Sequence, residues 1–151
     1  QYAFHVMNSC LSGMGGRLFL ELRDNKSLAY TVSSFYGPSP YLGHFGIYIG
    51  CSPEKKEESI AAINNEINSL VSQGVTSLEI ERSKNYLIGR NDISLQRNAN
   101  INSRISQSHF FGLGPKEPFH FSSKIRNVTI DQVNGVIEKY LNNTKQVTVA
   151  F

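Results

Sequence analysis

Apolar residues recur every three to four positions over most of this chain, and that spacing is typical of helices with one buried face. The pattern predicts helices over residues 1–11, 18–23, 53–73, 76–89, 93–111, 119–125 and 129–141. Segments rich in β-branched and aromatic residues, or alternating between apolar and polar ones, predict strands. These predicted strands cover residues 31–36, 45–49 and 146–151.

Capping residues set several of the helix boundaries. Ser52-Pro53-Glu54 combines a cap residue, a proline in the first turn and an acid near the positive end of the helix dipole. Gly74 stands where a helix-terminating residue is expected. Thr76 with Glu79, and Thr129 with Gln132, have the spacing of a capping box. Each box therefore predicts that a helix begins at that point.

The order of the elements indicates an α+β fold. The turn at residues 37–40 is short, so the two strands that it joins are expected to be antiparallel. We expect a two-layer domain in which helices pack on one face of a mostly antiparallel sheet. Residues 1–151 are enough for a single domain with a core of its own.

Charge and composition exclude some classes of partner. The net charge is +3, and no run of basic residues is longer than Lys55-Lys56, so we expect no nucleic-acid binding. No apolar run approaches the length of a membrane span, and no membrane partner is expected. Cys10 and Cys51 do not make a disulfide framework and are interpreted as small buried apolar residues. The cellular compartment stays open.

The most informative stretch is Gly13-Met14-Gly15-Gly16 followed by Leu22-Arg23 and Leu28-Ala29-Tyr30. The glycines lack the Lys-Ser/Thr ending of a phosphate loop, so we interpret them as a sharp turn between packed helices. The stretch resembles the domain of pitrilysin/insulysin-type zinc peptidases, the inverzincins, that holds no zinc. The resemblance extends over almost the whole chain, through Gly50-Cys51-Ser52-Pro53 and residues 84–89 to Val128-Thr129.

The resemblance implies specific roles for Arg23 and Tyr30. In this family the two matching residues reach into the active site, where they clamp the peptide and stabilise the tetrahedral intermediate formed at zinc held by a homologous domain. The expected fold is the metalloenzyme-like domain of the family, with its N-terminal strands missing here. Spacing alone instead favours an Arg23 that pairs with Asp24 or Glu21 at the surface and a half-buried Tyr30; the whole motif favours the site.

The sequence contains no zinc-binding motif. It has no His-x-x-Glu-His, and no two of its histidines stand four residues apart. We therefore predict no metal or other cofactor in this chain, zinc in a partner domain of the full enzyme, and no hydrolytic activity of the isolated chain. The expected partners are a peptide substrate and the homologous zinc-binding domain, in the same chain or in another subunit. The chain is thus expected to be a fragment of a longer peptidase.

Two other functions remain open at this point. The chain could be a catalytically inactive scaffold or assembly homologue, although a scaffold needs neither Arg23 nor Tyr30. It could also be a peptide-binding module that uses a sheet edge. Ser9 and Cys10 have no histidine and aspartate pattern beside them, which disfavours a serine or cysteine nucleophile.

Overall fold

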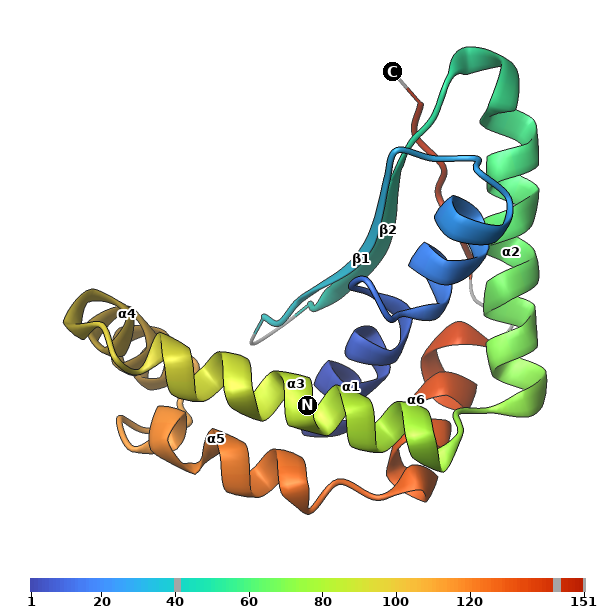
Figure 1. The fold of residues 1–151 in the computed structure, drawn as a ribbon. Helices are drawn as coiled ribbons and strands as arrows, with labels where there is room; N and C mark the ends of the chain where they lie inside the picture. Colours follow the sequence, from blue (N-terminus) through green and yellow to red (C-terminus); the bar gives the residue numbers. More distant parts are fainter. Residues whose placement is uncertain (40–41, 143–144, 151) are drawn as a thin grey trace.

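A computed structural model of the chain describes residues 1–39, 42–142 and 145–150. It is mostly helical, with one two-stranded antiparallel sheet among the described residues (Figure 1). The helices are, in chain order, α1 (Tyr2–Leu11), the π-helix η1 (Phe19–Asn25), the 3₁₀ helix η2 (Pro53–Lys55), α2 (Lys56–Gln73), α3 (Ser77–Ser94), α4 (Asn98–Phe110), α5 (Glu117–Arg126) and α6 (Ile130–Leu141).

The sheet is a hairpin with one covered face. β1 (Thr31–Gly37) pairs antiparallel with β2 (His44–Gly50), with Val32 opposite Ile49. Val32 and Ser34 are buried, whereas Phe35 on the other face is 47% exposed. Because successive side chains point to opposite faces, the alternation along β1 directs one face to the core and the other to solvent.

The core is built around α1. Its apolar residues Val6, Met7, Cys10 and Leu11 are completely buried. They occupy adjacent turns of the helix, and α1 packs against α3, α5, α6 and β1. Burial of each such side chain contributes about 1.5–3 kcal/mol before the entropy cost of ordering it. The helix that opens the chain is therefore the centre of the molecule.

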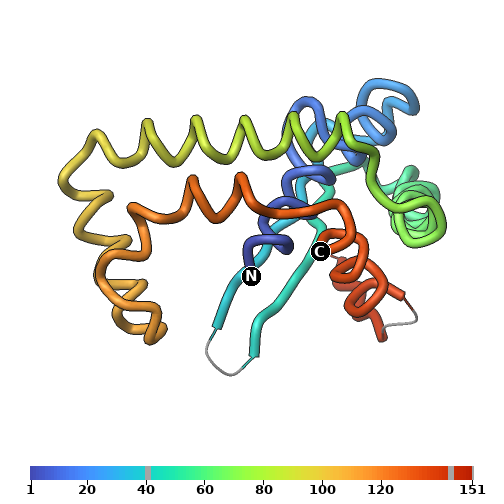
Figure 2. The backbone as a smooth tube through the Cα atoms, turned by 90° about the horizontal axis from the view of Figure 1, so that it is seen from below, coloured from blue at the N-terminus to red at the C-terminus, as the bar shows by residue number. Residues whose placement is uncertain are grey.

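The molecule has two parts that diverge from this core. The hairpin and α2 extend in one direction, and α3, α4 and α5 form an arm that extends in another (Figures 1 and 2). α4, at the end of the arm, packs on α5 and contains no buried residue. Below, "the arm" means residues 90–126, which comprise the last turn of α3 and the whole of α4 and α5.

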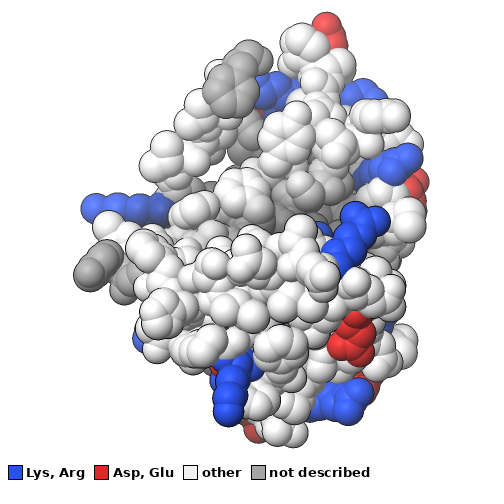
Figure 3. All heavy atoms as spheres, turned by 90° about the vertical axis from the view of Figure 1, so that its left-hand side faces the viewer, with Lys and Arg blue, Asp and Glu red and all other residues white. Residues whose placement is uncertain are grey.

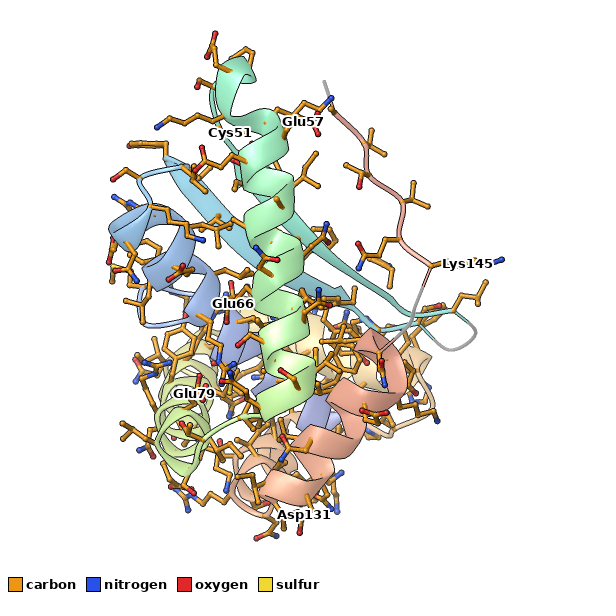
Figure 4. All side chains as sticks on the ribbon, turned by 90° about the vertical axis from the view of Figure 1, so that its right-hand side faces the viewer. Cys51, Glu57, Glu66, Glu79, Asp131 and Lys145 are labelled. Atoms are coloured by element: carbon orange, nitrogen blue, oxygen red, sulfur yellow. The ribbon has the colours of Figure 1, made fainter. Side chains whose placement is uncertain are left out.

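We expected a two-layer domain with a larger antiparallel sheet. The sheet is smaller than predicted, because the described residues form only two strands. The strand predicted at 146–151 is absent over residues 146–150, and Phe151 lies outside the described residues. Alternation produces a strand only where a neighbouring backbone can pair with it. Here a groove of about 1460 Å³, lined by β2, α2 and α6, lies along residues 145–150. Figure 4 labels Lys145 at the start of this segment.

The predicted boundaries of three helices need correction. α3 continues past Gly89 to Ser94, since a single glycine inside a helix costs only about 1 kcal/mol relative to alanine. The next helix begins at Asn98 and not at Ile93, because 3₁₀-type hydrogen bonds from Gln96 to Ile93 and from Arg97 to Ser94 interrupt the ladder. α5 is slightly longer than the predicted 119–125.

The predicted capping boxes and the predicted glycine turn are confirmed. Both capping boxes are formed, by Thr76 with Glu79 and by Thr129 with Gln132. The glycine cluster is a tight turn, because a Cβ at Gly16 would lie 2.5 Å from the carbonyl oxygens of Leu11 and Ser12. Within the described residues, none of the helices is both long enough and apolar enough to cross a membrane.

Candidate functional site

The candidate site lies where η1 leads into β1. Leu22 is completely buried in η1, and Leu28 and Ala29 are buried just before the strand. These apolar residues fix the segment to the core. Arg23 and Tyr30 stand next to them but are exposed, with Tyr30 87% exposed. The buried residues therefore hold a rigid base from which the two polar side chains project.

A backbone reversal brings these two residues together. Ser27 adopts the left-handed conformation (φ 50°), and its N–H donates to the Arg23 carbonyl at 3.1 Å. The Tyr30 N–H then donates to Gly50 O at 3.1 Å, which joins the segment to the hairpin. In a continuous α-helix seven residues would rise roughly 10 Å. Instead, the Arg23 guanidinium carbon lies 5.9 Å from the centre of the Tyr30 ring.

The Arg23 guanidinium is held by aromatic rings and not by acids. It lies 4.6 Å from the centre of the Phe19 ring, one helical turn away. Glu21 binds Lys26 at 3.2 Å and accepts a hydrogen bond from Asn25, and these hydrogen bonds lower the pKa of the Glu21 carboxyl. Among the described residues no carboxylate forms an ion pair with Arg23. The expected surface pairing of Arg23 with Glu21 or Asp24 is not found.

Sequence reasoning missed the ionic link that anchors the start of η1. Arg17 Nε donates to Glu79 Oε1 at 2.5 Å, and Arg17 Nη2 donates to the Gly74 carbonyl at 2.8 Å. Burial alone would raise the pKa of Glu79, but hydrogen bonds from Arg17 and Thr76 outweigh it and lower the pKa to about 2. Glu79 thus caps α3 and holds Arg17 at once. The capping box was visible in the sequence, but its partner 62 residues earlier was not.

The side chains present do not fit a zinc ion. Among the described residues, no three His, Cys, Asp or Glu side chains come together in a group that could hold a metal. The thiol of Cys10 is buried beside Ser83, and burial raises its pKa, so it is a poor nucleophile in this fold. Cys51 is also free. Donor groups, rather than a metal or a nucleophile, are the chemistry that the site offers.

The fold and site define a helical domain that presents an arginine and a tyrosine beside a hairpin. A family model described as the peptidase M16 inactive domain matches residues 1–87. The chain therefore belongs to the peptidase M16, or pitrilysin, family and is its inactive, C-terminal-type domain.

Curated relatives are named as zinc proteases. The chain is 29% identical over 150 residues to an uncharacterized zinc protease of Streptomyces coelicolor, which covers 99% of this chain and 33% of the relative. It is 29% identical over 136 residues to an uncharacterized zinc protease of Bacillus subtilis, and the match covers 89% of this chain and 33% of that relative. The chain spans about a third of the length of these relatives. A stromal processing peptidase from pea chloroplasts is 30% identical over 88 residues, 57% of this chain and 7% of that protein.

Solved structures share the fold. A peptidase M16 inactive domain from Pseudomonas fluorescens superposes with a TM-score of 0.85 at 26% identity, over 93% of this chain and 34% of that chain. An inactive peptidase domain from Bordetella parapertussis gives a TM-score of 0.80 at 18% identity, over 94% and 78%. The second likeness shows the fold alone.

Proposed function

We propose that this chain is the substrate-binding, chamber-closing domain of a zinc-dependent metalloendopeptidase, with Arg23 and Tyr30 as its peptide clamp. The observation that carries the proposal is the pairing of an exposed Tyr30 with an Arg23 guanidinium that no described carboxylate neutralises. The names of the relatives support the class of enzyme. A scaffold would need no such pair at a rigid junction.

Tyr30 would act on charge that develops during the reaction. A phenolic hydroxyl is a neutral donor that can reach a peptide carbonyl oxygen as that oxygen becomes negative. Removing one donor of this kind typically costs about 2.7–4 kcal/mol of transition-state stabilisation. The Tyr30 N–H donates to the Gly50 carbonyl, so the backbone from which the ring projects is held against the hairpin.

Arg23 would bind the peptide before the reaction. Its guanidinium offers several donors in a planar fork that can hold a backbone carbonyl of an extended peptide. Contacts with the rings of Phe19 and Tyr30 restrict the guanidinium before any peptide arrives. This restriction lowers the entropy cost of binding.

Zinc would come from another domain, because the described residues of this chain form no group that could hold it. When bound there, it supplies the Lewis acid for hydrolysis. The contribution of this chain is to orient the peptide and to donate hydrogen bonds.

The Arg23→Ala variant tests the clamp in an enzyme that contains both domains. We expect kcat/KM to fall about 10- to 100-fold, with a raised KM, since a hydrogen bond from a charged group contributes about 1.5–3 kcal/mol. Lys26→Ala is the control, because Lys26 lies in the same turn but binds Glu21. An unchanged kcat/KM in folded Arg23→Ala enzyme contradicts the clamp.

A further inference from the structure

Arg104 is a partly buried cation to which the described residues supply no acidic partner. It lies in α4, at the inner side of the arm, and its Nη1 donates to the Asn91 side-chain oxygen. Its guanidinium carbon lies 5.3 Å from the centre of the Phe121 ring. No carboxylate of the described residues lies within ion-pair distance. Burial lowers the pKa of Arg104, so its charge is incompletely stabilised by the fold.

Asn91 is held in one orientation by its own partners. Its side-chain nitrogen donates to Ser122 Oγ at 2.9 Å and to Asp92 Oδ1 at 3.2 Å. Ser122 Oγ in turn donates to Asp92 Oδ1 at 3.0 Å. The Asn91 oxygen is therefore fixed toward Arg104, and with Phe121 it sets the plane of the guanidinium. This arrangement preorganises the remaining donors of Arg104.

The arm has a surplus of positive charge. Residues 90–126 contain six Lys and Arg and two Asp and Glu, which gives a net charge of +4, whereas the whole chain has only +3. Both acids already have partners: Asp92 accepts hydrogen bonds from Asn91 and Ser122, and Glu117 accepts one from the Tyr2 hydroxyl and forms an ion pair with Lys124 at 2.5 Å. Figure 3, viewed from the side of the arm, shows Lys and Arg spread over a largely uncharged face.

A row of rings connects Arg104 to the hairpin. Phe121 contacts His5 with ring centres 5.6 Å apart, and His5 contacts Tyr36 of β1 at 5.4 Å. Tyr30 immediately precedes β1 and Tyr36 lies near the other end of the strand, and six residues of extended chain span roughly 20 Å. The row thus places Arg104 at the inner corner between the arm and the hairpin, at the end of β1 remote from Tyr30.

We propose that Arg104 is a subsite for a carboxylate of the bound peptide. This inference rests on the proposed function of the domain. The ligand is an acidic side chain or the C-terminal carboxylate, several residues away from the bond that Tyr30 approaches. A carboxylate is planar and matches the guanidinium fork, and it would neutralise a charge that the described part of the arm leaves unpaired.

Peptide binding to this 151-residue chain tests the subsite. The probes are labelled peptides of one sequence, with either glutamates or glutamines at positions remote from the centre, each with a free or an amidated C-terminus. Fluorescence anisotropy gives their dissociation constants. We expect a carboxylate to strengthen binding about tenfold at low salt, and less at high salt. If the glutamates strengthen binding, the carboxylate that Arg104 recognises is an acidic side chain; if the free C-terminus does so, it is the C-terminal carboxylate.

Three variants separate recognition from structural support. Arg104→Gln should abolish the preference for the carboxylate, and Arg104→Lys should keep part of it, because it retains the charge but loses the fork. Arg97→Gln is the matched control, since Arg97 is an exposed arginine at the start of the same helix. Thermal melts of all three report any loss of folding.

Equal affinity of wild-type protein for glutamate and glutamine peptides, with no effect of the free C-terminus, overturns the proposal. No measurable binding of the carboxylate peptides at millimolar concentration also overturns it. So does a preference that persists in Arg104→Gln. The clamp is tested separately by Arg23→Ala kinetics on a neutral peptide, so each proposal can fail alone.

Discussion

At the scale of the residue, His5 shows how burial controls charge. Its ring lies between those of Phe121 and Tyr36. Burial, the largest cause, together with the positive charge of Arg104, lowers its pKa from 6.5 to about 4. In the folded protein the His5 imidazole therefore stays neutral down to about pH 4. In the unfolded chain the same group takes up a proton at higher pH.

This difference predicts that stability falls as the pH falls from about 6.5 to about 4. In that window the unfolded state binds the extra proton, so the free energy of unfolding decreases by at most about 1.4 kcal/mol per pH unit from His5. Urea unfolding at several pH values measures the slope. His5→Phe keeps a ring but removes the titration, and its slope should be flatter. Identical slopes for the two proteins would show that His5 does not contribute.

At the scale of the element, one ion pair joins η1 to the corner between α2 and α3. Arg17 and Glu79 have side chains that are 16% and 15% exposed, so water screens the pair only partly. Arg17 also lies 3.8 Å from Glu66 on α2. Figure 4 shows Glu66 and Glu79 on neighbouring helices that face this point. The pair thus supports the segment that carries Arg23.

Glu79→Gln should lower the free energy of unfolding by about 1–3 kcal/mol at neutral pH, because it removes the carboxylate that hydrogen-bonds to Arg17 and leaves only Glu66, 3.8 Å away. The amide retains the capping geometry, so the loss reports the ion pair. Glu81→Gln is the control, since Glu81 is exposed and binds Lys84 at the surface. The difference should vanish as the pH falls from 4.5 through about 2, where Glu79 itself becomes protonated. Equal stability of both variants would contradict the anchoring role.

Periodicity and capping were sufficient to predict most helices and the hairpin. They could not predict η1 as a π-helix, because Leu18, Phe19 and Leu22 have a spacing that also suits an α-helix. They could not identify the Arg17 link or the Arg104 cluster, since those contacts join residues far apart in the chain. The alternation of apolar and polar residues over 146–150 predicted a strand that the structure lacks. Such alternation is a property of one segment and does not show whether another strand lies beside it to pair with.

At the scale of the whole molecule, the hairpin and the arm diverge from a core centred on α1 (Figures 1 and 2). The core holds the η1–β1 junction in place, while α4 at the end of the arm contributes no buried residue. The peptidase M16 inactive domain from Pseudomonas fluorescens has a similar fold, with a TM-score of 0.85. In our account, the body fixes the clamp and the arm adds selectivity for the peptide.

The most direct test of the central claim is the steady-state kinetics of Tyr30→Phe in an enzyme that joins this domain to its zinc-holding domain. Phenylalanine keeps the exposed ring and its contact with Arg23, so a thermal melt should match that of the wild type. We predict a fall in kcat on the order of 100-fold or more with little change in KM, because the hydroxyl acts on charge present only in the transition state. Wild-type kcat in the folded Tyr30→Phe enzyme would remove Tyr30 from the mechanism and favour the scaffold interpretation.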